Sequence, residues 1–421
     1  MTELAAPPPD APVTGAPAKK AAFAFIFVTV TLDILALGLI IPVLPALILR
    51  MEGGDTVAAL GWAGIFGTLW AAMQFFTAPV LGALSDKVGR RPIVLLSNFG
   101  LSLDYVVMAL APTVPWLLVG RVISGITAAS IPTSFAYVAD VTPPEKRAAA
   151  FGMLGAGFGL GFVVGPALGG SLGGHDPRLP FWVACALSGL NGLYGLLVLP
   201  ESLPKEKRGA FNWSRANPIN GFKLLASQPR LIGLASVKFI NDFAHVVYPA
   251  TFTYYAMYRF QWHEREVGLM LGLVGVAGIV VQAGLVGRAV RVLGERGALL
   301  LGLGCGAVGF AIYGLAPTAG LMMCGVPIAA LWGLAGPSGQ ALMSKRVGPT
   351  DQGRLQGSLS SLTGVAGVLG PAVFTGAFQY FISPGAPAHV PGAAFITAAV
   401  CVALSLPVAL FALRETPSVV G

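Results

Sequence analysis

Charge is scarce in this sequence, and the patterns of several kinds of site are missing. Only 10% of the 421 residues are charged, whereas soluble globular proteins carry about 25%. Together with 55% hydrophobic residues and a mean hydropathy of +0.77, this excludes an ordinary soluble protein. The few cysteines lie inside apolar runs without metal-ligand spacing, so we expect them to be packing residues; they are Cys185, Cys305, Cys324 and Cys401.

Catalytic and nucleotide-binding motifs are absent as well. The chain has no recognisable nucleophile and base pair, no GxxxxGK[ST] phosphate loop, no HExxH and no cysteine metal pattern. We therefore predict that the protein is not an enzyme, has no catalytic residue or metal site, and does not use ATP. Residues 1–21 lack the basic start and apolar core of a signal peptide, so we expect a disordered cytoplasmic tail.

Long apolar runs, in contrast, recur along the whole chain. A transmembrane helix needs about 20 mainly apolar residues to cross the ~30 Å hydrocarbon core of a bilayer. We therefore predict an all-α membrane protein of twelve transmembrane helices. The runs lie near 22–44, 57–81, 93–113, 115–139, 149–172, 180–199, 231–256, 266–286, 298–316, 319–343, 356–381 and 392–413.

The basic residues indicate how the helices are oriented. With both termini in the cytoplasm, twenty of the 26 Lys and Arg residues fall in cytoplasmic segments. Cytoplasmic loops of membrane proteins carry such an excess. The net charge of +8 is therefore explained by topology, and no separate basic domain is left to bind nucleic acid.

The chain also repeats itself. A constant shift that takes Gly82 to Gly287 superposes two basic turns between apolar runs. Duplicated multi-helix units of this kind are typical of secondary transporters. The same shift, which we call the repeat register, takes Gly89 to Gly294, Arg91 to Arg296, Pro132 to Pro337, Gly152 to Gly357 and Gly165-Pro166 to Gly370-Pro371.

This register predicts two six-helix repeats. We place the N-terminal six-helix bundle at 22–200 and the C-terminal one at 231–414. A polar, basic cytoplasmic linker at 201–230 joins them, and a cytoplasmic tail follows at 415–421. No feature requires more than a monomer.

Glycines form a stripe in the fifth apolar run. They recur every fourth residue, so they share one helix face and let another helix approach closely. Tight packing alone and a role in transport are both compatible with the stripe. Its residues are Gly157, Gly161, Gly165, Pro166 and Gly169.

Six ionisable residues lie at membrane depth, where such groups are costly and functional by default. In the first half we expect Asp33 to pair with Arg121, with Asp104 as a helix-packing hydrogen-bonding group or a substrate contact. In the seventh run Lys238, Asp242 and His245 share one helix face that could exchange a proton. The alternatives are a structural ion pair with a bystander histidine, or a Lys238 that reaches the membrane surface.

Neutral polar residues also lie at membrane depth. Gln74, Gln282 and Gln340 are expected to form interhelical hydrogen bonds, and the first two are also candidate substrate contacts.

Charged residues cluster at the predicted cytoplasmic turn after the second run. Carboxylates and guanidinium groups there can lock one face of a transporter and release it when the halves rock, which predicts a conformational gate; the alternative is a solvated basic loop of little energetic weight. The residues of this predicted gate are Gly82, Asp86, Gly89, Arg90, Arg91 and Asp140.

These motifs resemble those of the major facilitator superfamily. The stretch from Gly82 to Arg91 is similar to its signature loop after the second helix, Gly165-Pro166 to its fifth-helix antiporter motif, and Arg121 to its fourth-helix arginine. Further matches resemble the tetracycline/proton antiporter branch for drug efflux: Leu32-Asp33, Pro42-Val43-Leu44-Pro45, Ser102-Leu103-Asp104-Tyr105, Gly120-Arg121, Val281-Gln282-Ala283 and Leu355-Gln356-Gly357.

The resemblance implies an antiporter in a bacterial inner (plasma) membrane that exports a small amphipathic, tetracycline-like drug by alternating access. Protons are then the coupling ion through Asp33, Arg121, Asp242 and His245, and no cofactor is expected, although a divalent metal can travel with the substrate. Substrate contacts are assigned to Asp104, Gln74, Gln282 and Lys238.

Two positions depart from the branch. The ninth-helix aspartate of tetracycline exporters is replaced by Gly306, and their eighth-helix histidine by Gly278. Asp242 and His245 are candidates to replace these groups. Two other functions stay open on the sequence: a proton-coupled importer of a metabolite, and a membrane sensor that binds a ligand without moving it.

Overall fold

The computed structural model describes residues 16–143, 146–211, 213, 217–218, 222–348 and 351–414. This described part is helical and contains no strand, which confirms the predicted all-α class. The first helix begins at Ala16, so residues 16–21, which we had assigned to the tail, are helical. The rest of that tail and the tail at 415–421 lie outside the described residues.

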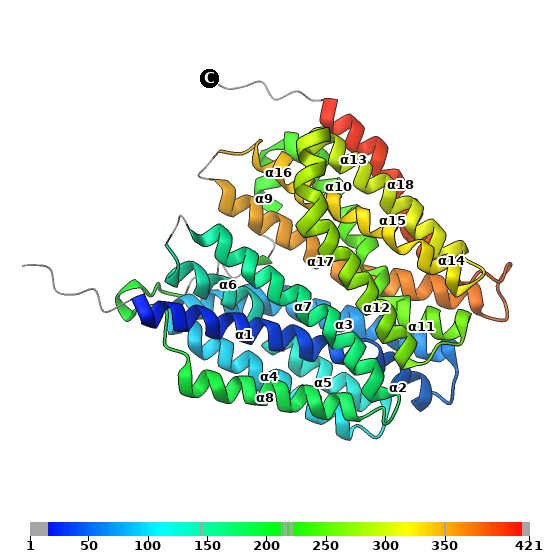
Figure 1. The fold of residues 1–421 in the computed structure, drawn as a ribbon, viewed down its shortest axis with the longest axis horizontal. Helices are drawn as coiled ribbons and strands as arrows, with labels where there is room; N and C mark the ends of the chain where they lie inside the picture. The colour runs from blue at the N-terminus through cyan, green and yellow to red at the C-terminus, as the bar shows by residue number, and fades with distance from the viewer. Residues whose placement is uncertain are drawn as a thin grey trace, which may run out of the picture.

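The N-terminal half is a bundle of long helices, drawn from blue to green in Figure 1. Its elements are α1 (Ala16–Ile40), α2 (Val43–Met51), α3 (Thr56–Val88), α4 (Arg90–Leu110), α5 (Val114–Thr127), α6 (Ser130–Val141), α7 (Arg147–Gly173) and α8 (Leu179–Val198).

The linker contains three short helical elements and leads into the C-terminal half. The linker elements are η2 (Lys205–Lys207), α9 (Phe222–Ser227) and η4 (Pro229–Leu231). The second bundle consists of α10 (Ile232–His245), α11 (Val247–Phe260), α12 (Glu264–Ile279), the π-helical turn η5 (Val280–Leu285), α13 (Val286–Leu315), α14 (Ala319–Cys324), α15 (Val326–Ala330), the 3₁₀ turn η6 (Leu331–Leu334), α16 (Ala335–Ser344), α17 (Gln352–Ile382) and α18 (Ala393–Arg414).

Prolines explain where several transmembrane stretches break. A proline ring clashes with the carbonyl group of the fourth residue before it and removes one helical hydrogen bond. Pro132 lies just after the break between α5 and α6, and its repeat partner Pro337 follows η6. Pro249 likewise follows the break between α10 and α11. Irregular backbone therefore recurs at equivalent depths in the two halves.

Ten helical stretches in the described part are long and apolar enough to cross a membrane. The stretch Glu264–Leu315 has 52 residues and contains a non-helical residue, Gly294, at φ 67° and ψ 170°, so it comprises two of the predicted runs. The polar pair α10 and α11 is the predicted seventh run and is not among the ten. With these two features, the described helices account for the twelve runs of the sequence.

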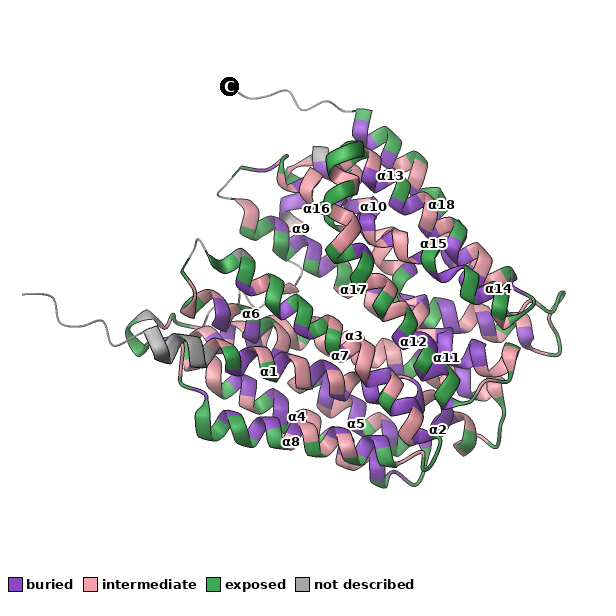
Figure 2. Cartoon of the chain, viewed as in Figure 1, coloured by how far each residue is buried: buried purple, intermediate pink, exposed green. Residues whose placement is uncertain are grey.

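Exposed positions lie along the outside of both bundles (Figure 2), and many of them are large apolar residues. Leu197, Leu190 and Leu404 are among the most exposed large apolar residues. In a bilayer such residues face lipid, and the backbone is satisfied inside each helix. The polar groups that matter for function are therefore those turned inward.

The two halves meet along α3 with α17 and along α7 with α12. At the end of the molecule away from the linker, Arg50 on α2 forms an ion pair with Glu264 on α12. Nearby, Gln379 Nε2 on α17 donates to the carbonyl oxygen of Val57 on α3 at 2.9 Å. We call this the far end and the opposite one the linker end. The far end is held together by contacts between the halves.

Candidate functional site

A cavity of about 1050 Å³ lies between the halves at the linker end. The α3 wall is aromatic, with Trp70 and Phe75, and also carries the predicted contact Gln74. Apart from Arg354, the α17 wall is made of small residues, including Gly364, where an added Cβ would lie 2.5 Å from the Phe75 ring. Linker residues complete the lining. The cavity thus combines a flat apolar wall with scattered neutral polar groups.

Asp33 lies inside the N-terminal half with neutral partners. Its carboxylate accepts hydrogen bonds from the Ser130 hydroxyl and from Asn191 Nδ2 at 3.1 Å, and Thr29 donates to Asn191 Oδ1 at 3.1 Å. The residue is 4% exposed. In the described part of the chain, Asp33 takes part in no ion pair, so the predicted pairing with Arg121 is wrong.

Arg121 pairs instead with Asp104, at 2.5 Å between Nη2 and Oδ2. Asp104 is 0% and Arg121 7% exposed. The contact is possible because Gly120 has no side chain: an added Cβ would lie 2.4 Å from Asp104 Oδ1. Asp104 is therefore a partner of α5 within the half, and its carboxylate does not reach the cavity in this conformation.

The seventh-run face is assembled as an ion pair with a hydroxyl group beside it. Lys238 and Asp242 pair on α10. Thr363 Oγ1 on α17 lies 2.5 Å from Asp242 Oδ2 and 3.2 Å from Lys238 Nζ. The Lys238 ammonium group therefore stays at this pair and does not extend to the membrane surface. Thr363 also lines the cavity, so this ion pair adjoins it.

His245 has a different environment from the pair. It is exposed, and its ring lies 5.5 Å from Trp332 and 6.0 Å from Tyr248 between centroids. The Trp332 indole donates to Asn241 Oδ1 at 2.6 Å and occupies the space beside Gly306, where an added Cβ would lie 2.5 Å from the ring. A larger residue at position 306 is therefore incompatible with Trp332 in this position.

Two of the predicted interhelical hydrogen bonds of glutamines are present. Gln282, in the π-helical turn, donates to the carbonyl oxygen of Gly333 at 3.4 Å. Gln340 donates to Gln356 at 3.3 Å. These bonds connect η5 with η6 and α16 with α17 in the C-terminal half.

The glycine stripe packs α7 directly on α1. A Cβ atom added to Gly165 would lie 2.8 Å from the Cα atom of Gly38, and one added to Gly169 would lie 2.0 Å from the carbonyl oxygen of Leu39. Gly157 and Gly161 contact Thr31 and its neighbours in the same way. The predicted close approach of a second helix is confirmed.

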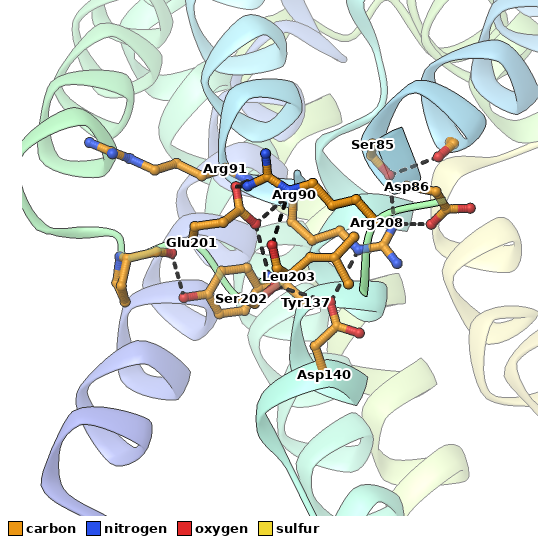
Figure 3. Close-up of polar contacts among 12 residues, drawn as sticks. Ser85, Asp86, Arg90, Arg91, Tyr137, Asp140, Glu201, Ser202, Leu203 and Arg208 are labelled. Carbon is orange, nitrogen blue, oxygen red and sulfur yellow. Dashed lines mark hydrogen bonds and ion pairs between the residues drawn. The ribbon is translucent and has the colours of Figure 1, made fainter. Parts of the chain in front are cut away.

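The predicted gate residues form one network at the linker end (Figure 3). Arg90 pairs with Asp86 at 2.6 Å and with Asp140 at 3.2 Å, and it donates to Ser85 Oγ at 2.7 Å. Arg91 Nη2 donates to the carbonyl oxygen of Leu196 on α8 at 2.5 Å. The expected carboxylate and guanidinium cluster is thus present, and its described contacts stay within the N-terminal half and the linker.

Glu201 is a member of this network that we did not predict. Its carboxylate accepts from the backbone N–H of Arg90 at 2.8 Å, so it caps the N-terminus of α4, where a negative charge is favourable. Gly89, at φ 111°, leaves room for it. The signal in the sequence was an acidic residue directly after Pro200 at the end of the sixth run.

The C-terminal half repeats this turn with the charges exchanged. In the repeat register Arg90 corresponds to Glu295 and Asp140 to Lys345, and these two also form an ion pair. Gly294 repeats the positive φ of Gly89. The hydrogen bond from Lys345 holds the pKa of the Glu295 carboxyl below its ordinary value.

Arg50 and Glu264 are a second feature that sequence reasoning missed. Glu264 has a nearly buried side chain although it begins a helix, and its carbonyl oxygen lies against Gly170, which follows the glycine stripe of the fifth run. The available signal was an acidic residue at the start of the eighth run. A sequence does not say which loop of the other half will face it.

The sequence is similar to those of known proteins. A family model described as Major Facilitator Superfamily matches residues 26–371. The class C tetracycline resistance protein of Escherichia coli is 36% identical over 347 residues, covering 82% of this chain and 87% of that protein. The class G protein of Vibrio anguillarum is 37% identical over 353 residues, covering 83% and 88%.

Solved structures of membrane transporters are similar to this chain in fold. The human organic anion transporter MFSD10 (TETRAN) has a TM-score of 0.68 at 25% identity, covering 94% of this chain and 100% of that one. A bacterial homologue of the human lysosomal transporter Spinster has a TM-score of 0.75 at 17% identity, covering 96% and 99%, and so shares the fold. The chain is therefore a multi-pass membrane transporter of small molecules, not an enzyme, and belongs to the major facilitator superfamily.

Proposed function

We propose that this protein exports a small amphipathic, tetracycline-like compound in exchange for protons. It does so as a monomer in the bacterial inner membrane, with both termini and the linker in the cytoplasm. The tetracycline resistance proteins among its relatives support drug efflux, and the excess of Lys and Arg at the linker end supports the orientation.

The observation that carries the proposal is the cavity, which is lined from both halves and adjoins the linker. At the far end the halves are joined by the Arg50 and Glu264 ion pair. A binding site between two repeats that opens to one side at a time is the arrangement required for alternating access. The conformation described here would receive substrate from the cytoplasm.

Opening the other way requires the far-end contacts to break and the linker end to close. The network of Asp86, Arg90 and Asp140 lies at that end and would act as the gate there. Rigid halves rocking about α3, α17, α7 and α12, where they touch, are sufficient for this motion.

Proton exchange is assigned to two carboxylates. Asp33 is buried with neutral partners, and an ionised carboxylate without a cation is costly to bury, so a bound proton stabilises the closed interior of the N-terminal half. Asp242 adjoins the cavity through Thr363 and can respond to substrate. Arg121 would hold Asp104 in place, and His245 would supply a second titratable group beside Asp242.

The lining of the cavity indicates the kind of substrate. Trp70 and Phe75 offer flat apolar surfaces, and Gln74 and Ser360 offer neutral hydrogen-bonding groups. Arg354, the one ionisable residue among the described residues of the lining, pairs with Asp351. This suits a ring-bearing compound with several polar groups. No resident cofactor is proposed, and a divalent cation chelated by the substrate would travel as cargo.

Uptake of radiolabelled tetracycline into everted vesicles tests the function. An imposed proton gradient should drive accumulation, Asp33→Asn should remove it, and Glu206→Gln, which neutralises an exposed linker acid, should retain it. Equal accumulation with and without the gradient would refute proton exchange. Absence of uptake by folded protein would refute tetracycline as the substrate.

A further inference from the structure

Thr363 touches both the cavity and the ion pair. It is an exposed residue of α17 and lines the cavity. Its hydroxyl oxygen lies 2.5 Å from Asp242 Oδ2, 3.2 Å from Lys238 Nζ and 3.0 Å from the carbonyl oxygen of Leu359 one turn earlier. Any group that binds this hydroxyl from the cavity must share it with Asp242.

A hydroxyl group has one hydrogen to donate and two lone pairs to accept with. Lys238 uses one lone pair, since an ammonium group can only donate. Asp242 and the Leu359 carbonyl compete for the single hydrogen. The second lone pair is the only hydrogen-bonding capacity left on the Thr363 hydroxyl. The protonation state of Asp242 decides which group donates a hydrogen bond to it.

When Asp242 is ionised it can only accept, so Thr363 donates its hydrogen to the carboxylate. In this state no described residue other than Lys238 donates to the hydroxyl oxygen, so its second lone pair can accept from a ligand in the cavity. Donation to the charged carboxylate also makes the hydroxyl oxygen a stronger acceptor. When a proton binds Asp242, the new O–H group donates to that lone pair. The hydrogen of Thr363 turns to the Leu359 carbonyl, and no capacity remains for a ligand.

Among the described residues, no second carboxyl group beside Asp242 could take up the proton in its place. The helices packed most extensively against α10 in the described part are α11, α16, α17 and α18, and their sequences contain no Asp or Glu. The turn η6, whose Trp332 bonds Asn241, has none either, and the one acid of the neighbouring α13, Glu295, pairs with Lys345. The basic residues of those four helices, Arg259, Arg354 and Arg414, lie near helix ends, as does Arg230 of η4. On α10 itself Lys238 contacts the carboxylate, and His245 follows one turn later.

We propose that Thr363 couples substrate to proton: an N–H or O–H group of the substrate and the proton on Asp242 compete for one lone pair of its hydroxyl. This deepens the proposed function and rests on it. It assigns to the substrate a hydrogen-bond donor at this wall of the cavity. Mutual exclusion of substrate and proton at one atom is what exchange requires.

Binding measurements on purified protein test the competition, with tetracycline as the probe. In the wild type, binding should weaken as the pH falls and should release a proton. Thr363→Val should bind about fivefold more weakly at high pH, as expected for one lost hydrogen bond, and should lose the proton release. Thr363→Ser should keep both properties.

Thr397→Val is the matched control, because Thr397 on α18 also bonds the carbonyl group four residues earlier, at 2.9 Å. It should behave as the wild type does. Proton release by Thr363→Val equal to that of the wild type would overturn the inference.

A second measurement does not depend on the substrate. Infrared difference spectra taken across a pH jump should show a carboxylic acid band that Asp242→Asn removes. Thr363→Val should shift this band, since a hydrogen bond of the acid is lost, and Thr397→Val should not. An unshifted band would overturn the role of Thr363, whereas failure of tetracycline transport alone would overturn only the choice of substrate.

Discussion

The two halves share a backbone plan but distribute their charges differently. The N-terminal half buries Asp33 among neutral groups and pairs Asp104 with Arg121 in its interior. The C-terminal half keeps Lys238 and Asp242 beside the cavity and fills its interior with aromatic rings around Trp332 and Phe310. Duplication thus preserved turns and helix breaks, while each half acquired its own polar groups.

The turns at the linker end show the same difference in its simplest form. Arg90 and Asp140 in one half and Glu295 and Lys345 in the other are equivalent pairs of opposite sense. The Arg90 side chain is 12% exposed, whereas that of Lys345 is 64% exposed. The position of the ion pair is the same in both halves, but the Arg90 pair should stabilise the fold more than the more exposed Lys345 pair.

The largest expected effect is at Asp242, the proposed proton site beside the cavity. Asp242→Asn should abolish accumulation driven by a proton gradient, because Thr363 then keeps one fixed hydrogen-bonding state. Exchange of labelled for unlabelled substrate without a gradient should continue. Everted vesicles measure both, and an Asp242→Asn protein with unchanged gradient-driven transport would falsify the assignment.

Breaking the buried pair of the N-terminal half should have the next largest effect. Arg121→Met leaves the Asp104 carboxylate buried without a cation, which costs about 3–5 kcal/mol. Adding Asp104→Leu removes that charge and should recover much of the loss. Unfolding in detergent measures both, and a double variant less stable than the single one would contradict this account.

Glycines of the two halves should differ in how much stability is lost when they are replaced by alanine. Gly165→Ala brings a methyl group against the backbone of α1, which cannot move aside, and should cost about 1–3 kcal/mol, as overpacking does. In the C-terminal half, an added Cβ at Gly376 on α17 would have no atom within 4 Å. Gly376→Ala should therefore cost less, and equal losses in unfolding experiments would contradict the comparison.

The smallest effect is expected at the exposed pair. The pKa of Glu295 is lowered by the hydrogen bond from Lys345, so the pair stabilises the folded state above the unfolded pKa of the acid and ceases to do so as the pH falls through the folded one. Lys345→Ala should slightly lower stability at neutral pH and have no effect in acid. A loss that persists in acid would show that Lys345 acts elsewhere.

Local signals account for what could be predicted from the sequence. Apolar length predicted the spans, and the repeat register predicted the paired turns at Gly89 and Gly294. The contacts between Asp86 and Arg90 and between Lys238 and Asp242 were within reach because residues four apart share a helix face. These features depend on spacing along the chain, which a sequence displays directly.

Contacts between distant helices required the fold. Asp33 forms hydrogen bonds with Ser130 and Asn191 and does not pair with Arg121. Glu201 and Glu264 contact residues that are more than one hundred positions away in the sequence. The link from Asp242 to Thr363 is of the same kind. Hydrophobic periodicity fixes which residues of a helix avoid water, but in a lipid environment nearly every face is apolar. Which faces meet is decided by the shapes of neighbouring helices, and only the assembled bundle contains that information.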